Sequence, residues 1–378
     1  MSHVAEFNSL EELSPYREMW HSLLAQTERA TFFQSLDWLE AYWTHYGAAQ
    51  KLRVLIVDAG GETLGILPLC IRTEPYKVGR LRVLMYPLHD WGTYYGPIGP
   101  NPTATLLAGL RYLRSTRRDW DLIDLRWIDN DRLDHGRTAA ALDQAGFAAD
   151  QELYNTSGVI DLAGSFEKYM SDRGTKWRNN LRRHERRMLE HGKLTHVRYR
   201  PAGAARGDGD PNWVMYDTCE AIARRSWQGS SPDGTTLSHD SVRAYFRDAH
   251  ARAAQLGMLD MNLLVVGDDP VAFAYNYHYQ GLLQGMRIGF DPEKPAEGAG
   301  NLLYTRIVEG SYALGDTQYD LGPGSLEAKR HLITATENSY RCTHFPVSVR
   351  AQALRAKRVV KHWWKKRQSD ATPQPAAT

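Results

Sequence analysis

Hydrophobic residues follow two repeated patterns along this chain: short apolar runs joined by tight turns, and segments with an apolar residue every three or four positions. The segment 52–72, LRVLIVDAGGETLGILPLCIR, has two apolar runs around Gly60 and Gly61, which predicts a β-hairpin. The segment 261–279 repeats this arrangement about 208 residues later. Each hairpin precedes a Gly/Pro-rich stretch and then a helical pattern, so we expect two similar α/β halves.

Helical periodicity predicts helices over residues 9–28, 36–46, 176–191 (closed by Gly192) and 212–227. The stretch 201–211 has the composition of a loop, and the last seven residues that of a disordered tail. We therefore divide the chain into a first half (1–155), a second half (156–348) and a basic amphipathic helix with its tail (349–378). Each half is expected to contain a mixed, mostly antiparallel sheet flanked by helices.

Composition narrows the class of protein. With 378 residues, of which 42% are hydrophobic and 24% charged, the chain can form two sizeable cores. No apolar run reaches the roughly 20 residues of a membrane span, and the start lacks the pattern of a signal peptide. Three well-separated cysteines predict a reduced, cytoplasmic protein without a structural zinc.

The net charge of +2 is unevenly distributed. Ten Lys/Arg and two acids lie between residues 173 and 200, and eight Lys/Arg without an acid lie between 350 and 367, so the remainder is acidic. The first segment could bind the phosphates of an acyl carrier, a phosphorylated substrate or RNA, or be a solvated basic face. The second places Val349, Ala353, Ala356, Val360 and Trp363 on one stripe. Such a helix suits an anionic membrane surface or docks on the protein's own core.

Most familiar catalytic motifs are missing. The chain has no GxxxxGK[ST], GxSxG, HExxH or CxxC sequence, and its 14 histidines show no convincing metal-ligand spacing. We therefore expect no metal site. The informative run is 282–332: a strand over 285–290, a loop ending in Gly298–Ala299–Gly300, a helix from Asn301 to about Leu314, a short strand over 318–321 and a Gly-Pro-Gly turn.

The glycine loop ahead of this helix predicts an anion site. Asn301 is the expected N-cap, and backbone N–H groups at a helix N-terminus suit a pyrophosphate. An ordinary strand-to-helix turn is the alternative.

This order of strand, glycine loop, helix and strand after a long hairpin resembles the GNAT acyltransferases. The best resemblance is to the CelD-type (cellulose-biosynthesis-type) acetyltransferases, relatives of the Fem-type tandem-GNAT transferases. The loop Gly298–Leu302 stands where that family has Ser-Pro-Gly-x-Leu, and Asp320, Gly322, Gly324 and Lys329 match its Asp-x-Gly-x-Gly with a following Lys. The helix beginning at Lys176 and the Arg225-Ser226-Trp227 segment are also similar.

The resemblance implies an acyl-CoA donor and transfer of an acyl group, acetyl in the first place, to an amine. It also implies donor contacts at the residues Gly289, Phe290, Gly298, Ala299, Gly300, Asn301 and Leu302. A backbone N–H near Gly289 or Phe290 would contact the thioester carbonyl. Asp320 is the leading candidate for the base, or else caps its turn or pairs with Lys329. Lys329 binds an anionic group or holds Asp320, and Tyr304 or Tyr312 protonates the leaving thiolate or packs in the core.

An aromatic loop in the first half, PLHDWGTYYGPIGP, could line a substrate pocket between the halves or pack on itself. We take His89, Asp90, Tyr94 and Tyr95 from this loop as substrate candidates, with Trp91 beside them. Arg178 and Trp227 join them through the family resemblance.

The function that we expect is N-acyl transfer to a small-molecule or glycan amine. By family analogy, this reaction would belong to polysaccharide or cell-envelope metabolism. The protein is expected in the cytoplasm, at the inner membrane surface if the C-terminal helix binds there. Two alternatives stay open. One is a Fem-like transferase that uses aminoacyl-tRNA. The other is a non-catalytic scaffold, because Pro295 and the altered loop depart from the GNAT pattern.

Overall fold

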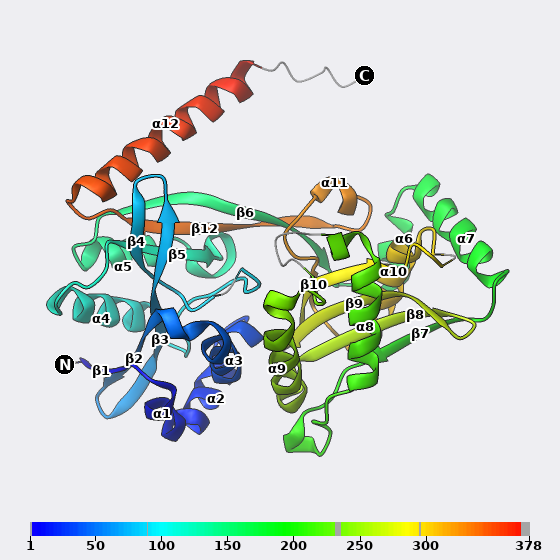
Figure 1. Cartoon of the computed structure of the whole chain (residues 1–378), viewed down its shortest axis with the longest axis horizontal. Coiled ribbons are helices and arrows are strands. Elements are labelled where there is room, and N and C mark those ends of the chain that lie inside the picture. Colours follow the sequence, from blue (N-terminus) through cyan, green and yellow to red (C-terminus); the bar gives the residue numbers. More distant parts are fainter. Residues whose placement is uncertain (1, 89, 231–235, 295, 372–378) are drawn as a thin grey trace.

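A single sheet runs through the protein. The computed structural model describes residues 2–88, 90–230, 236–294 and 296–371, and its strands form a 12-stranded sheet (Figure 1). The strand order is β1-β2-β3-β4-β5-β12-β6-β11-β10-β9-β8-β7. The parallel pairs are β4–β5 and β10–β11, and the other neighbours are antiparallel. The predicted class, a mostly antiparallel sheet flanked by helices, is confirmed.

The first half contains the predicted hairpin and one of the two predicted helices, together with elements that the sequence did not indicate. Its strands are β1 (Ser2–Phe7), β2 (Gln50–Ala59), β3 (Glu62–Tyr76), β4 (Gly79–Met85) and β5 (Leu122–Ile128). Its α-helices are α1 (Leu10–Leu13), α2 (Arg17–Ala25), α3 (Leu36–Tyr46), α4 (Pro102–Ser115) and α5 (Arg137–Gln144). The β2–β3 hairpin is confirmed, as is α3. The helix predicted over 9–28 is instead divided by a 3-10 turn at Ser14–Tyr16, because Pro15 has no N–H to continue an α-helix.

The second half follows the same order. Its strands are β7 (Leu194–Tyr199), β8 (Leu259–Val266), β9 (Asp269–Tyr279), β10 (Leu282–Phe290) and β11 (Gln318–Asp320). Its α-helices are α6 (Phe166–Ser171), α7 (Thr175–Leu189), α8 (Trp213–Arg225), α9 (Asp240–Leu256), α10 (Ala299–Leu314) and α11 (Leu326–Lys329). The β8–β9 hairpin and the helices predicted at 176–191 and 212–227 are confirmed to within a few residues.

Two long strands connect the halves. β6 (Ala149–Asp161) and β12 (Ala335–His344) pair antiparallel, from Val159 opposite Ala335 to Ala149 opposite His344. β12 also pairs with β5 of the first half, and β6 with β11 of the second. Figure 1 shows this ribbon along the top of the molecule, reaching over both halves. The division at residue 155 falls inside β6 and stays a prediction.

Aromatic packing also holds the halves together. The ring of Phe32 lies 4.5 Å from that of Tyr277, and the ring of Trp38 lies 5.4 Å from that of Tyr245. All four side chains are buried within one hydrophobic core that takes residues from both halves. The relative position of the halves is therefore fixed by burial as well as by the shared strands.

The C-terminal helix α12 (Val349–Ala371) docks through a face that the sequence did not indicate. Ala351 and Leu354 are buried beside Phe345, whereas Val349, Ala353, Ala356 and Val360 of the predicted stripe are exposed. Trp363 lies outside the described side chains. The prediction that this stripe docks on the protein core is therefore wrong. Arg355 pairs with Asp150 on β6 at 2.8 Å, which orients the helix, and Figure 1 shows α12 projecting away from the body.

Within the described residues, no helix combines the length and apolar character required to cross a membrane. Surface association through the exposed stripe of α12 stays a prediction.

Candidate functional site

The parallel strands β10 and β11 separate at Asp320. They pair only over three positions, from Leu282 opposite Gln318 to Gln284 opposite Asp320. Beyond this point β10 continues to Phe290 along β9, while the chain after Asp320 turns away. A carboxylate thus stands where two strands of the second half diverge.

The turn after Asp320 depends on close backbone packing. Gly322 has φ +74°, and a Cβ atom there would lie 2.4 Å from the carbonyl oxygen of Gly285. The Nζ of Lys329 donates to the carbonyl oxygens of Leu321 (2.8 Å), Gly322 (2.7 Å) and Pro323 (3.2 Å). The side chain of Lys329 therefore holds the turn through the turn's backbone carbonyl oxygens. In the described part of the chain, no ion pair joins Lys329 to Asp320.

Asp320 is nearly fully buried, with one oxygen accepting a 2.7 Å hydrogen bond from the N–H of Gly322. The pKa of this carboxyl is raised to about 6, chiefly by burial and also by the nearby Glu337 carboxylate, against the opposing effects of the Gly322 N–H and Lys329. A carboxylate that titrates near neutrality can accept a proton from a reacting group. Tyr94 of the first half adjoins it: burial and the Asp320 charge both raise the pKa of that phenol.

The matching place in the first half is filled by the chain itself. β4 and β5 pair only at Val83–Leu122 and Leu84–Ile123. The N–H of Tyr95 then donates to the carbonyl of Trp127 at 3.0 Å, and Ile98 exchanges two 2.8 Å backbone hydrogen bonds with Ile66 of β3. The segment 95–98 thus bonds to strands on both sides, which leaves the opening at β10–β11 as the candidate reaction site.

That filling segment borders a cavity of about 710 Å³. Tyr94 and Tyr95 line it from the first half, and Gln284, Gln318 and Asp320 line it from the second. These two tyrosines therefore lie in a cavity, and their role as substrate contacts stays a prediction. The other residues of the aromatic loop lie elsewhere: Asp90 lines a smaller cavity of about 130 Å³, Trp91 packs under Arg287, and His89 lies outside the described residues.

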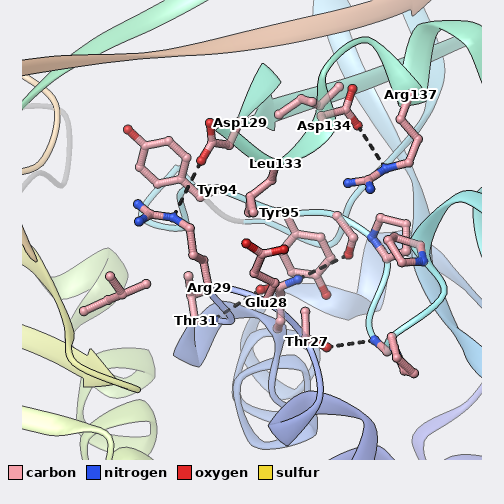
Figure 2. Close-up of a pocket in the computed structure, with 18 of the residues that line it drawn as sticks. Thr27, Glu28, Arg29, Thr31, Tyr94, Tyr95, Asp129, Leu133, Asp134 and Arg137 are labelled. Atoms are coloured by element: carbon pink, nitrogen blue, oxygen red, sulfur yellow. Dashed lines mark hydrogen bonds and ion pairs between the residues drawn. The ribbon is translucent and has the colours of Figure 1, made fainter. Parts of the chain in front are cut away.

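Charged residues that the sequence analysis missed surround this cavity (Figure 2). The guanidinium group of Arg29 donates a 2.6 Å hydrogen bond to the side-chain oxygen of Gln318. Its nitrogens also lie 3.5 Å from a carboxylate oxygen of Glu337 on β12 and 3.9 Å from one of Asp129. Burial and the Glu337 charge raise the pKa of Asp129. No motif marks these charged residues, because they come from three separate segments.

Two residues beside this cavity have strained backbones. Arg29 has φ +51° and Tyr94 φ +46°, in the left-handed region that side chains other than glycine rarely adopt. Such strain is typical of functional sites, where the surrounding structure holds residues in unfavourable conformations.

The helix α10 begins earlier than predicted. Gly298, with φ +80°, is its N-cap, so the expected cap Asn301 is wrong: it lies exposed in the first turn. Glycine is required at 298 because of the positive φ and because a Cβ would lie 2.5 Å from the His184 ring. A Cβ on Gly300 would meet no atom within 4 Å, so the backbone is open there.

A second cavity, of about 410 Å³, lies at the start of α10. Its lining residues are Lys176, Trp177, Asn180, Leu181, His184, Asn301, Arg330 and His331. Two cations and the positive end of a helix dipole meet here, a combination that attracts phosphate groups. No group of three or more His, Cys, Asp or Glu suited to a metal occurs among the described residues.

The remaining candidate residues are placed as follows. Gly289 packs against the Phe273 ring on β9, and Phe290 is partly exposed at the end of β10. Ala299 and Leu302 are buried in the core beneath α10 together with Tyr304, whose ring lies 6.0 Å from that of Tyr319.

Two further candidates are on other elements: Arg178 bonds to Thr175 on α7, and Trp227 is exposed after α8. Tyr304, Arg178 and Trp227 line neither of the two cavities described above.

Residues 175–330, from the start of α7 to the residue after Lys329, match the family model "Acetyltransferase (GNAT) domain". A crystal structure of FemX has a TM-score of 0.58 at 11% identity, with 89% of this chain and 96% of that chain covered. The C-terminal domain of a putative lysylphosphatidylglycerol synthetase from Agrobacterium fabrum has a TM-score of 0.52 at 11% identity, with 93% and 97% covered. Among the curated proteins, no sequence matches this chain.

Residues 175–330 of the second half are therefore similar to a GNAT acetyltransferase domain, and the whole chain shares its fold with these structures. The CelD-type resemblance stays a prediction.

Proposed function

We propose that this protein is an N-acyltransferase that moves an acyl group from acyl-CoA, acetyl-CoA in the first instance, to an amine bound between the halves. The observation that carries the proposal is the position of Asp320. It lies where β10 and β11 diverge within the GNAT-matching segment, and it lines the large cavity formed with the first half.

The chemistry follows from this placement. After any ammonium proton has been released to solvent, the neutral amine nitrogen attacks the thioester carbon, a C–N bond forms, the C–S bond breaks, and the nitrogen loses one proton. Asp320 accepts that proton, and the thiolate leaves and takes a proton from solvent. A backbone N–H along the part of β10 beyond Gln284 stabilises the oxyanion. Lys329 acts as a positioning residue, because it fixes the turn that follows Asp320.

The donor is expected at the start of α10. Its pyrophosphate would lie against the N–H groups after Gly298 and beside Lys176 and Arg330. The open space next to Gly300 leaves room for this approach.

Substitutions at the two loop glycines distinguish an effect on the start of α10 from an effect on donor binding. We expect Gly298→Ala to destabilise the protein by about 1 kcal/mol or more and to weaken donor binding, because it strains a left-handed residue and strikes His184. Gly300→Ala is the matched control and should leave the melting temperature unchanged. Gly300→Leu should keep stability but weaken acetyl-CoA binding by calorimetry; unchanged binding would place the donor elsewhere.

Two rival functions make different predictions for ligand binding. The basic face of α7 and the shared fold with FemX keep the aminoacyl-tRNA route open, and the departures at the glycine loop keep a non-catalytic scaffold open. Calorimetry with acetyl-CoA, longer acyl-CoAs and charged tRNA distinguishes the three. We expect acyl-CoA binding; binding of charged tRNA alone would favour the Fem-like route, and binding of no donor would favour the scaffold.

A role in polysaccharide or cell-envelope metabolism, peripheral to the inner membrane, remains our proposal by family analogy. It is supported by the exposed apolar stripe and basic composition of α12.

A further inference from the structure

The large cavity carries charges of both signs, and they differ in how well they are paired. Its described lining includes five carboxylates (Glu28, Asp129, Asp134, Asp320 and Glu337) and two guanidinium groups (Arg29 and Arg137). An excess of carboxylates favours a ligand that carries a positive charge, such as a protonated amine.

Arg29 is held by protein groups. It bonds to Gln318 and lies within 4 Å of both Glu337 and Asp129. Glu337 in turn accepts from Gln318 at 2.5 Å and pairs with Arg132 at 2.7 Å. This network holds β11, β12 and the loop after α2 together, so Arg29 supports the cavity wall.

Arg137, in the first turn of α5, is different. Its nearest carboxylate is Asp134 at 3.8 Å, and the oxygens of Asp134 already accept from the N–H and the hydroxyl of Thr138. The Nε of Arg137 is buried, and in the described part of the chain it has no hydrogen-bond acceptor. A buried donor without an acceptor costs free energy, which a ligand oxyanion would recover.

The two ends of the cavity are therefore chemically distinct. Figure 2 shows Arg137 and Asp134 on one side and Arg29, Asp129 and Tyr94 on the other, with Leu133 and Tyr95 between them. Asp320 adjoins Tyr94.

We infer that the acceptor is a zwitterion: an amine that also carries a carboxylate or phosphate group, with the amine directed to Asp320 and the anionic group bound by Arg137. A planar guanidinium binds either oxyanion through two parallel hydrogen bonds. The volume of about 710 Å³ suits a molecule larger than a simple amine. This inference rests on the proposed function for the role of Asp320, but not for binding at Arg137.

Matched compound pairs test the class of acceptor. L-lysine is compared with cadaverine, which lacks the carboxylate, and glucosamine 6-phosphate with glucosamine, which lacks the phosphate. Thermal shift at 10 mM and titration report binding without any donor, and transfer from labelled acetyl-CoA reports chemistry. In at least one pair, we expect the compound that carries the anionic group to stabilise the wild type more than the compound that lacks it. The pair that shows this difference identifies the anionic group as a carboxylate or a phosphate.

Arg137→Met should weaken that binding roughly 10- to 100-fold. Arg137→Lys should restore part of it, and Arg117→Met, an exposed arginine, should change nothing. In turnover the loss should raise KM and leave kcat nearly unchanged, because Arg137 lies on the opposite side of the cavity from Tyr94 in Figure 2, and Tyr94 adjoins Asp320.

Three results would overturn the inference. They are equal binding of both members of each pair, an unchanged preference in Arg137→Met, and no thermal shift with any of the four compounds. If instead acetyl-CoA fails to bind while the anion-bearing amines still do, the proposed function fails and the inference on Arg137 stands.

Discussion

Replacing Asp320 by asparagine is expected to slow acyl transfer by roughly 10²- to 10⁴-fold, the usual contribution of a general base. Asparagine keeps the shape and can still accept the hydrogen bond from the N–H of Gly322, but it cannot take a proton. Single-turnover rates with saturating donor measure the chemical step, and donor affinity should not change. Asp269→Asn, an exposed carboxylate at the β8–β9 turn, is the control.

The pH dependence gives an independent check. Asp320 has a pKa of about 6 in the folded protein, above its ordinary value of 3.8, so the rate should rise through pH 6 as the base forms. The protonated form is the one that folding favours. Its contribution to stability is therefore complete below pH 3.8 and is lost as the pH rises through 6. Asp320→Asn should lack this loss and be at least as stable as the wild type at pH 8.

If Asp320→Asn keeps the wild-type rate, Asp320 is structural and another group removes the proton. A parallel fall in rate and melting temperature would point to damage of the turn that Lys329 holds.

The largest loss of stability is expected at Asp124 on β5. This fully buried carboxylate accepts from Arg126 at 2.8 Å and from Thr343 at 3.0 Å, and it also pairs with Arg341 of β12. Burial alone would raise its pKa, but Arg126 and Arg341 hold the pKa below the ordinary value. Asp124→Ala leaves two guanidinium groups without this partner, so the free energy of unfolding should fall by about 3–5 kcal/mol.

Chemical denaturation of Asp124→Ala beside Asp150→Ala measures this difference. Asp150, on β6 of the same ribbon, pairs with Arg355 of α12 but is only half-buried, so its loss should cost at most about 1 kcal/mol. The lowered pKa of Asp124 contributes stability above pH 3.8 that disappears as the pH falls further, and Asp124→Ala should lack that loss. Equal costs for both variants would mean that the buried network does not fasten β12 to β5.

Local patterns predicted the two hairpins, the strands and helix around the glycine loop, and several other helices. The paired apolar runs around Gly60–Gly61 and around residues 267–268 predicted both hairpins, because alternation and turn residues act within a few positions. β1 was missed because SHVAEF has too few apolar residues, and it forms only by pairing along β2. The insertion of β12 beside β5 has no local signal, since it joins residues more than 200 positions apart.

The candidate site shows the same limit. Asp320 and Lys329 were indicated by a short motif, and their turn packs as such motifs require. Arg29, Asp129, Arg137 and Glu337 converge only through the tertiary fold, so no spacing could reveal them. Lys329 was expected to bind an anionic group or to hold Asp320. Instead it donates to three backbone oxygens, which a sequence pattern does not encode.

The shared ribbon has a consequence for biosynthesis. A ribosome releases the chain from its N-terminus, so β5 emerges long before β12, which ends at His344. Until then one edge of β5 has no partner, and unpaired strand edges invite association with other chains. A fragment ending near residue 330, although it holds the whole GNAT-matching segment, would keep that edge and the facing edge of β6 open. We therefore expect such fragments to aggregate, and the first half to complete its sheet only after nearly the entire polypeptide has been made.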